Sequence, residues 1–284
     1  MKEIFNNLEE QFVEVNGIKL HTILIGSGEP LVLLHGFPDF WYGWKNIILG
    51  LKDKNKLIIP DMRGYNLSDK PKGVNNYNVD ILAEDIKKLT DELNLGKFTL
   101  AGHDWGGVIS YVFAEKFSNE LKKLIILNAP HPKIFQKHLR TDKKQQKASN
   151  YIFEFMKPDG EKFLFEDNLM WLKRAVFSSV KDEFDRQKYI QAWSQPDAIV
   201  SGVNYYRANL SFDDWSGVIN VPTLVIWGMK DIALLSGLLE GLSKYISDLK
   251  IVRSENSGHW IMYDDPELVI SSIQDFLEGN DFFS

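Results

Sequence analysis

Short apolar runs recur along the chain, and longer segments with helical spacing lie between them. A run that is apolar at consecutive positions is typical of a strand buried on both faces of a parallel sheet. Six runs fit this description: 31–34, 57–59, 98–101, 124–127, 223–227 and 249–252. Their alternation with helical segments predicts an α/β fold with a doubly wound, mostly parallel sheet.

Local signals predict a hairpin and two helices around these strands. Asn16-Gly17 between apolar-rich runs predicts a β-hairpin over residues 13–20. Apolar residues on one face predict a helix that Gly96 caps at its C-terminal end, namely Leu82, Ile86, Leu89 and Leu93. Asp265-Pro266 is typical of an N-cap and a first turn, ahead of buried positions at Val269, Ile273, Phe276 and Leu277.

The alternation of strands and helices is interrupted between about residues 130 and 217. This stretch has no strand-like run, contains many aromatic residues, and shows helical spacing at Phe165, Leu169, Leu172 and Val176. Ligands of open α/β sheets bind beyond the carboxyl ends of the strands. We therefore expect a core domain of residues 1–129 and 218–284, with residues 130–217 inserted after the sixth strand as a helical lid over a pocket. A helical layer on the surface is the alternative interpretation.

Composition and charge narrow the classes of function. The 284 residues carry a net charge of −6, which argues against nucleic acid as a partner because phosphate binding needs a basic surface. The chain has no cysteine, which excludes disulfides, thiolate nucleophiles and cysteine metal sites. The N-terminal residues lack the apolar core of a signal peptide, and no apolar run approaches the ~20 residues of a membrane span. We therefore expect a cytoplasmic protein without a membrane partner.

The hexapeptide 102–107 (GHDWGG) joins a predicted strand to a predicted helix. Its frame, G-x-nucleophile-x-G, is the sharp turn on which many hydrolases present a serine, and small neighbours let strand and helix approach closely. Here the central residue is Asp104. The N-terminus of a helix favours an ionised carboxylate, and such a carboxylate is a competent nucleophile toward carbon. A helix-capping role is the alternative for Asp104.

Three segments together resemble the epoxide hydrolase branch of the α/β-hydrolase superfamily, whose near relatives include haloalkane and haloacetate dehalogenases. They are HGFPDFWYGW at 35–44, DMRGYNLS at 61–68 and GHDWGG at 102–107. The similarity spans almost the whole chain and is weakest in the predicted lid. The combined motifs are more specific for the fold than for the reaction.

The resemblance implies a particular backbone around the nucleophile. It predicts a cis peptide bond before Pro38 and an oxyanion hole made by the backbone N–H groups of Phe37 and Trp105. Asn66 departs from the glycine that is usual in the family, but asparagine tolerates a left-handed backbone.

An aspartate nucleophile needs a base, and the base needs an acid that orients it. His259 lies in a loop between the last predicted strand and the final helix, as the chain order of nucleophile, acid and base requires. The other histidines lie in turn motifs, in a predicted strand or at the start of the lid: His21, His35, His103, His131 and His138. His259 is therefore the expected base.

Asp231 is the expected acid because it follows the predicted strand 223–227. Some relatives carry this acid after the preceding strand, but that strand ends here in Leu127-Asn128 without a carboxylate. We expect Asp61 to form a structural ion pair with Arg63 instead.

The leaving group decides which lid residues are needed. An epoxide oxygen leaves as an alkoxide and needs O–H donors, whereas a halide needs N–H donors such as tryptophan. The segment 203–209 (VNYYRAN) is similar to the family's lid segment with a ring-opening tyrosine, which corresponds to Tyr206 here. The segment 150–158 is a looser match that implies Tyr151 as the second donor, with Tyr189 and Tyr205 as alternatives. Packing is the other role open to these tyrosines.

Residues and resemblance together predict an epoxide hydrolase that converts apolar epoxides to vicinal diols. Asp104 attacks carbon to form an alkyl-enzyme ester, and water activated by His259 and Asp231 hydrolyses that ester. Trp41 and Trp105 are expected in the wall of an aromatic pocket. The partners are then a small apolar substrate and water. The sequence has no phosphate-binding loop and no metal-spaced cluster, so we expect no cofactor and no metal.

Two other hypotheses use the same residues. A haloalkane or haloacetate dehalogenase would attack with Asp104 and use Trp105 as a halide donor. A ligand-binding protein on a hydrolase scaffold is the third, because fold alone does not fix function. The presence of all three triad members argues against it. The sequence leaves the oligomeric state open between a monomer and a homodimer.

Overall fold

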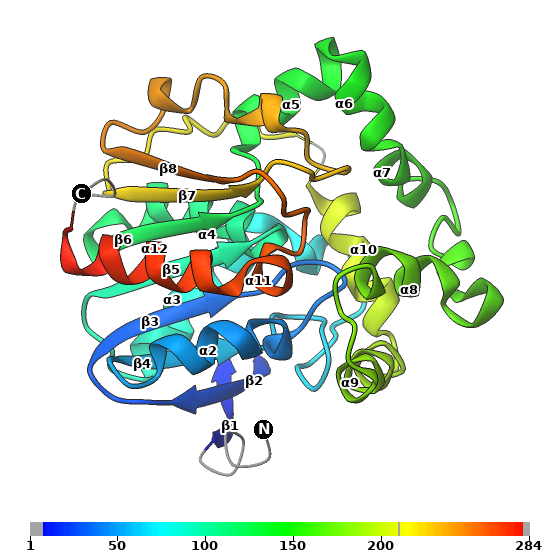
Figure 1. Ribbon diagram of the computed structural model, residues 1–284. Helices are drawn as coiled ribbons and strands as arrows, with labels where there is room; N and C mark the ends of the chain where they lie inside the picture. The colour runs from blue at the N-terminus through cyan, green and yellow to red at the C-terminus, as the bar shows by residue number, and fades with distance from the viewer. Residues whose placement is uncertain (1–7, 210, 281–284) are drawn as a thin grey trace.

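One sheet runs through the middle of the molecule (Figure 1). The computed structural model describes residues 8–209 and 211–280, and eight strands of this part form the sheet. The strands are β1 (Glu9–Val15), β2 (Ile18–Ile25), β3 (Glu29–Leu34), β4 (Asn55–Pro60), β5 (Phe98–His103), β6 (Leu121–Leu127), β7 (Thr223–Gly228) and β8 (Leu249–Ser254). All six apolar runs of the sequence therefore lie in strands, as predicted.

The sheet is mostly parallel. Its strand order is β1-β2-β4-β3-β5-β6-β7-β8, with parallel pairing from β4 through β8. β1 pairs antiparallel with β2, and β2 pairs antiparallel with β4. The predicted hairpin joins β1 to β2, and Asn16 and Gly17 in its turn have φ values of 45° and 73°. The α/β fold with a mostly parallel sheet is confirmed.

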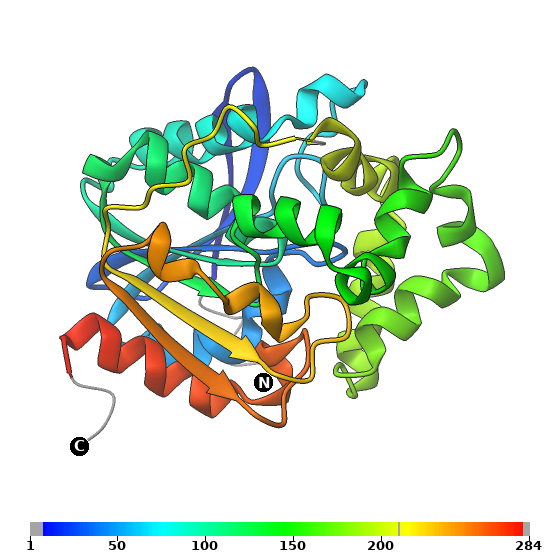
Figure 2. The same cartoon turned by 90° about the horizontal axis from the view of Figure 1, so that it is seen from above.

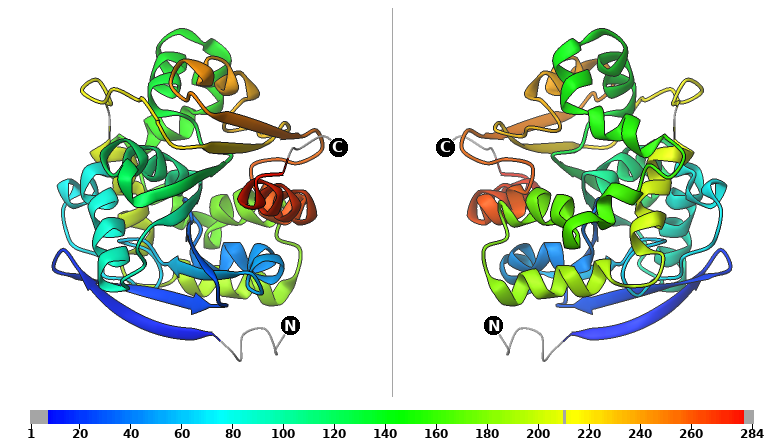
Figure 3. Two further views of the ribbon diagram at one scale, coloured as in Figure 1. Left: turned by 90° about the vertical axis from the view of Figure 1, so that its left-hand side faces the viewer. Right: turned by 90° about the vertical axis from the view of Figure 1, so that its right-hand side faces the viewer.

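The two faces of the sheet bury alternate residues of the same strands. Leu31 and Leu33 of β3 pack on one face with α2 (Lys45–Leu51) and α12 (Pro266–Glu278). Val32 and Leu34 pack on the other face with α3 (Val79–Glu92) and α4 (Trp105–Lys116). Figure 3 shows these two helix layers on opposite sides of the sheet. Because both faces are covered, the strands read as continuous apolar runs rather than as an alternating pattern.

Short helical elements complete the core. Four of the elements in the described residues lie in loops between strands and helices, namely η1 (Trp41–Trp44), η2 (Val74–Tyr77), η3 (Ser118–Glu120) and α11 (Ile261–Asp264). Two more lie between β7 and β8, namely η5 (Ser236–Leu239) and η6 (Leu242–Lys244). Asp265 caps α12 as predicted, and its carboxylate accepts the backbone N–H of Leu268.

The end of α3 differs from its prediction. The left-handed residue that follows the C-cap is Asn94, with φ of 50°, and not Gly96. The N–H of Leu95 bonds to the carbonyl of Thr90, and the N–H of Asn94 bonds to that of Asp91. This is the hydrogen-bond pattern of a Schellman motif. Gly96 was the wrong choice because asparagine also tolerates this backbone, and it occurs first.

All the elements between β6 and β7 are helical in the described residues. They are α5 (Pro132–Thr141), α6 (Lys143–Ala148), α7 (Asn150–Phe155), η4 (Lys162–Asn168), α8 (Met170–Phe177), α9 (Glu183–Trp193) and α10 (Ala198–Ala208). We call this segment the insertion. Figures 1 and 2 show it beyond the end of the sheet to which the parallel strands point. The insertion follows the sixth strand, as predicted.

The predicted helical spacing from Phe165 to Val176 does not form one helix. Leu169 has φ of 62° and separates η4 from α8. Phe165 is exposed, whereas Leu172 and Val176 are buried. Three consecutive residues with positive φ, Asp167 to Leu169, turn the chain between the two elements. Spacing alone cannot detect such a break, because it contains neither glycine nor proline.

Buried polar contacts join α9 and α10 to the core. Asp185 of α9 accepts a hydrogen bond from Tyr42 (2.7 Å) and pairs with Lys45. The indole N–H of Trp193 donates to the carbonyl of Pro38 at 2.6 Å. In α10, the Tyr205 hydroxyl donates to the carbonyl of Arg63 at 2.6 Å. These two helices are therefore fixed to the loops after β3 and β4.

Arg63 forms its buried ion pair with Asp85 of α3, and the predicted pair with Asp61 is wrong. The Nε and Nη2 atoms of Arg63 lie 2.6 and 2.7 Å from the two carboxylate oxygens of Asp85. Asp61 instead accepts hydrogen bonds from His21 Nδ1 (2.6 Å) and the Trp41 backbone N–H (2.9 Å). Residues two apart in a turn need not face one another, and sequence proximity gave the wrong partner.

None of the helices in residues 8–209 and 211–280 is both long enough and apolar enough to cross a membrane.

The packing of α4 against β3 predicts the effect of a small substitution. A Cβ atom at Gly106 would lie 2.2 Å from the carbonyl oxygen of Leu34, and backbone cannot move aside as a side chain can. We expect Gly106→Ala to lower the free energy of unfolding by at least ~1–3 kcal/mol, the usual cost of overpacking. Urea denaturation measures it.

Gly237→Ala is the matched control, because a Cβ there would meet its nearest atom, in His138, at an ordinary 3.7 Å. It should leave the unfolding free energy unchanged or raise it by ~0.4–1 kcal/mol. Equal stability of the two variants would contradict the described contact.

Candidate active site

The turn between β5 and α4 holds Asp104 in a strained backbone conformation. Its φ and ψ are 52° and −122°, a region that residues with a side chain rarely adopt. A Cβ at Gly102 would lie 2.3 Å from the carbonyl oxygen of Gly106. The glycines of the motif therefore allow the close strand-to-helix approach that was predicted. The Asp104 side chain makes no capping hydrogen bond to α4, which argues against the capping role.

Two backbone N–H groups hold the Asp104 carboxylate. The N–H of Phe37 lies 2.7 Å from Asp104 Oδ1, and the N–H of Trp105 also favours the charged carboxylate and lowers its pKa. The peptide bond between Phe37 and Pro38 is cis, as expected. A Cβ at Gly36 would lie 2.3 Å from Asp104 Oδ1, so only glycine fits beside the carboxylate.

His259 and Asp231 approach Asp104 from the loops after β8 and β7. His259 Nδ1 lies 2.8 Å from Asp231 Oδ2, and His259 Nε2 lies 3.8 Å from Asp104 Oδ2. Asp104 and Asp231 are buried, and the structure brings the three predicted residues together. Because Asp231 accepts a hydrogen at Nδ1, the Nε2 atom is the one that faces the nucleophile.

Asn128 is a site residue that we did not predict. Its side-chain amide donates to Asp231 Oδ2 at 2.8 Å, and its Oδ1 accepts the N–H of Gly228. The backbone N–H groups of Ala233 and Leu234 donate to Asp231 Oδ1 at 2.8 and 2.9 Å. Asn128 occupies the strand end where some relatives carry the acid. Its place after an apolar strand was the signal that could have identified it.

The buried charges of the triad shift one another's pKa values. Burial alone would lower the pKa of His259, but the carboxylates of Asp231 and Asp104 raise it to about 9. Burial alone would raise the pKa of Asp231, but His259 and its hydrogen-bond donors hold it below the usual value. Burial raises the pKa of Asp104, although His259 and the two backbone N–H groups oppose this shift.

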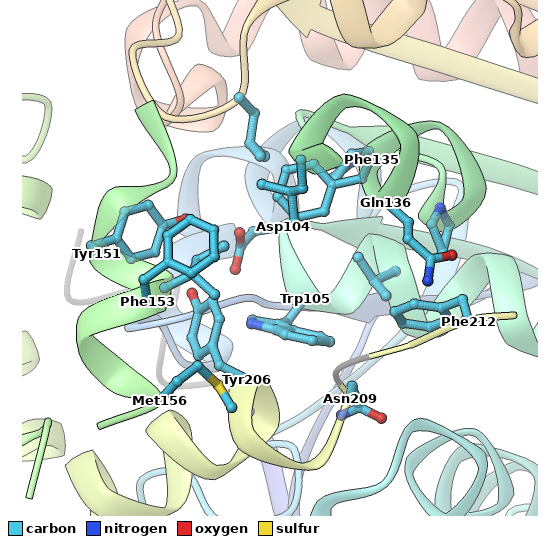
Figure 4. A pocket seen from close by; sticks show the side chains of 16 residues that line it. Asp104, Trp105, Phe135, Gln136, Tyr151, Phe153, Met156, Tyr206, Asn209 and Phe212 are labelled. Carbon is cyan, nitrogen blue, oxygen red and sulfur yellow. The ribbon is translucent and has the colours of Figure 1, made fainter. Parts of the chain in front are cut away.

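A cavity of about 880 Å³, including its open mouth, lies between Asp104 and the insertion. Figure 4 shows the side chains around it, which come from both the core and the insertion. The walls are mostly apolar and aromatic: Trp105, Val108, Pro130, Pro132, Phe135, Leu139, Ile152, Phe153, Met156, Phe212 and Leu234. Asp104, Gln136, Tyr151, Tyr206 and Asn209 are the other lining residues. A cavity of this kind suits an apolar small molecule.

Tyr151 of α7 and Tyr206 of α10 both line this cavity. Figure 4 shows their phenol oxygens directed toward its centre, on the same side as Asp104. Their ring centroids lie 6.0 Å apart, and burial raises the pKa of each phenol well above its usual value. Both side chains therefore stay neutral O–H donors near neutral pH. Tyr206 and Tyr151 are the two residues that were expected to be the O–H donors of the lid.

The two alternative tyrosines have other partners and do not line the cavity. The Tyr189 hydroxyl donates to the Tyr263 hydroxyl at 3.2 Å. Tyr205 is the buried anchor on the Arg63 carbonyl described above. Tyr151 is thus the tyrosine that shares the cavity with Tyr206.

Trp41 does not line the cavity at Asp104, contrary to expectation. It lies with His21, Phe40 and Phe184 around a separate hollow between β2 and α9. η1 begins at Trp41, and its backbone N–H is held by Asp61, which keeps the residue on that side of the sheet end. Trp105 lines the cavity as predicted.

Two histidines of the turn motifs make structural contacts in the core. His35 Nε2 accepts the backbone N–H of Met62 at 3.0 Å, and His103 Nε2 lies 2.9 Å from the carbonyl oxygen of His259. Both support loops, as expected. Within the described part of the chain, no group of three or more His, Asp or Glu side chains is arranged to hold a metal ion.

Comparison with known proteins agrees with this geometry. A family model described as alpha/beta hydrolase fold matches residues 29–266, and the chain belongs to this family.

Individual relatives narrow the family further. The AB hydrolase superfamily protein YfhM of Bacillus subtilis is 37% identical over 95% of this chain and 98% of its own length. Human epoxide hydrolase 4 is 31% identical over 94% of this chain and 77% of its own. The crystal structure of a variant of Bacillus megaterium epoxide hydrolase, complexed with its naphthyloxy-propanediol product, has a TM-score of 0.89 at 33% identity, covering 94% of this chain and 100% of that one. Within the α/β hydrolases, the chain lies in the epoxide hydrolase branch.

The electrostatics of the triad give a testable pKa. Asp104→Asn removes a negative charge 3.8 Å from His259 Nε2 and preserves the shape of the side chain. The pKa of His259, about 9 in the native protein, should fall because one of the three carboxylate charges that raise it is lost. NMR titration of the His259 imidazole measures the shift.

Asp142→Asn is the control, because Asp142 caps α6 in the insertion and is not among the groups that shift His259. It should leave the pKa of His259 unchanged. The described geometry would be contradicted if both variants titrated like the native protein.

Proposed function

We propose that this protein is an epoxide hydrolase that converts apolar epoxides into vicinal diols through a covalent ester on Asp104. One observation carries the proposal: a buried carboxylate and two neutral phenols face one another across an apolar cavity. The carboxylate supplies a nucleophile for carbon, and the phenols supply protons for an oxygen leaving group. The residues 130–217 act as the lid of this site, over a core domain of residues 1–129 and 218–284.

In the first step, Asp104 Oδ2 attacks a ring carbon of the epoxide. The carbon–oxygen bond of the ring breaks, and the epoxide oxygen takes a proton from Tyr206 or Tyr151. Asp104 Oδ1 stays on the N–H of Phe37 and becomes the carbonyl oxygen of the ester. The hydroxyl donors stabilise the negative charge that develops on the leaving oxygen.

In the second step, water attacks the ester carbonyl carbon of Asp104. His259 Nε2 takes a proton from this water, and the Phe37 and Trp105 N–H groups stabilise the oxyanion. Ester formation removes the Asp104 charge, which is one of the causes of the raised pKa of His259. The pKa of His259 therefore falls once the ester exists, and the neutral base becomes available at the step that needs it. Collapse of the oxyanion breaks the ester bond to the substrate carbon's oxygen, and this alkoxide takes the proton from His259 to complete the diol. The proton left on the Asp104 carboxyl group returns to the phenolate, which restores the carboxylate and the tyrosine.

The donors in the cavity favour an epoxide over a halide. A halide would need N–H donors, and Trp105 is the tryptophan that lines the cavity. Two phenols share the cavity with this indole, and the rings of Trp105 and Tyr206 meet edge-to-face with centroids 5.1 Å apart. The dehalogenase hypothesis therefore ranks second. A non-catalytic binding role ranks third, because a binding protein has no need of an assembled triad.

The cavity supports substrates with a bulky apolar group. Eleven of its sixteen lining residues are apolar, and five of these come from α5 and α7. The Bacillus megaterium relative has been crystallised with a naphthyloxy-propanediol product. Aryl and alkyl epoxides are the substrate class that we propose for this protein.

Oxygen labelling tests the covalent step. If Asp104 attacks carbon, the oxygen delivered in the first turnover comes from the carboxylate, and water refills the carboxylate afterwards. A single turnover of an aryl epoxide in ¹⁸O-water with excess enzyme should give unlabelled diol and label in the peptide that contains Asp104. Mass spectrometry of both products measures this. Direct attack by water would label the diol in the first turnover and overturn the mechanism.

Removal of one phenol hydroxyl tests the leaving-group assignment. Tyr206→Phe should slow ester formation from an epoxide by ~10²–10³-fold, the usual effect of losing one oxyanion donor. Stopped-flow tryptophan fluorescence follows this step. Tyr205→Phe is the matched control one residue earlier, because Tyr205 does not line the cavity, and it should change the rate by only a few-fold. Fast halide release from alkyl halides without epoxide turnover would support the dehalogenase instead.

A further inference from the structure

His103 connects the nucleophile to the catalytic base through a buried hydrogen bond. It is the last residue of β5 and immediately precedes Asp104, yet it does not line the cavity. Its side chain is fully buried, and its Nε2 lies 2.9 Å from the backbone carbonyl oxygen of His259. The bond spans 156 residues of sequence. It joins the turn that carries the attacking carboxylate to the loop that carries the base.

The chemistry of this contact fixes the state of His103. A carbonyl oxygen only accepts hydrogen bonds, so Nε2 must carry the proton. Burial and the neighbouring His259 imidazole lower the pKa of His103 to about 3, which keeps the ring neutral. Its ring centroid lies 4.8 Å from that of His259 and 5.4 Å from that of Trp260. His103 is therefore a neutral, rigidly packed N–H donor.

Other contacts hold the His259 loop in different directions. The N–H of Gly258 donates to Asp264, and the indole of Trp260 donates to the carbonyl of Ala175 in the insertion. Asp231 orients the His259 ring through Nδ1. The hydrogen bond from His103 ties the backbone of His259 to the turn that carries Asp104.

We propose that His103 is a positioning residue for ester hydrolysis: it sets the distance between His259 and the ester on Asp104. This inference rests on the proposed function. His259 Nε2 lies 3.8 Å from Asp104 Oδ2, and the attacking water must fit between the base and the ester carbon. A displacement of ~1 Å in such an arrangement can slow a reaction by ~10²-fold. Ester formation does not need this distance, because Asp104 is held by Phe37 and Trp105.

Half-reaction kinetics test this role. His103→Leu removes the N–H donor at similar volume, and His103→Gln retains an amide donor that can reach the same carbonyl. With an aryl epoxide, we expect His103→Leu to slow ester hydrolysis by ~10²-fold and ester formation by less than ~3-fold. The alkyl-enzyme should then accumulate, and intact mass after acid quench should detect it. His103→Gln should recover most of the hydrolysis rate.

His131 offers a matched control. It is also fully buried, and its Nε2 lies 2.9 Å from the carbonyl oxygen of Gly217. Its ring stacks on Tyr245, and burial lowers its pKa to about 4. His131→Leu therefore removes an equivalent hydrogen bond away from the triad. It should leave the ratio of the two half-reaction rates unchanged, whatever it does to stability.

The outcomes separate the positioning role from a structural one. Equal loss of both half-reactions in His103→Leu, no recovery in His103→Gln, or the same rate ratio in His131→Leu would each overturn the inference while leaving the proposed function in place. If His103→Leu does not fold, His103→Phe keeps a ring without the donor and should show the same selective loss. Absence of any alkyl-enzyme in the native protein would contradict the proposed function itself.

Discussion

The site depends on a carboxylate held in a backbone conformation that the chain would not adopt alone. Asp104 has positive φ at the junction of β5 and α4. This conformation persists because Gly36 leaves room for the side chain, while Gly102 and Gly106 let β5, α4 and β3 approach closely. The same approach brings the N–H of Phe37 to its oxygen. Strain of this kind survives only where the surrounding structure over-determines it. The covered parallel sheet supplies that surrounding structure.

The pKa of His259 depends on the carboxylates beside it, and the proposed ester step removes the charge of one of them. Two carboxylates flank its ring, and Asn128 and two backbone N–H groups hold the one that remains charged throughout. In the proposed mechanism, Asp104 is the carboxylate that loses its charge during turnover, because it forms the ester. The affinity of His259 for a proton thus follows the covalent state of the nucleophile. No conformational change is needed to switch the base on.

The sequence predicted the parts of this fold that arise from local pattern. Buried strands, the elbow glycines and the chain order of Asp104, Asp231 and His259 follow from periodicity and motif, and the structure agrees. Two other predictions were wrong. Arg63 pairs with Asp85 and not with Asp61, and Trp41 lines a different hollow from the one at Asp104. These choices depend on where α3 and η1 pack, which pattern does not encode. Asn128 was not predicted because only a carboxylate was expected to act at this strand end. Its amide instead donates a hydrogen bond to the carboxylate of Asp231.

Tyr205 and Tyr206 are neighbours on α10, yet one fastens the helix to the core and the other faces the cavity. One of the two proposed donors, Tyr206, is therefore built into a helix that is fixed to the core. α5 and α7 supply five of the eleven apolar wall residues, and α7 also carries the second proposed donor, Tyr151. Substrate range can consequently diverge through the apolar residues of α5 and α7 while both proposed donors stay in place. For a designer of new selectivity, the apolar wall residues of α5 and α7 are the positions to change, and Tyr151, Tyr205 and Tyr206 are the positions to keep.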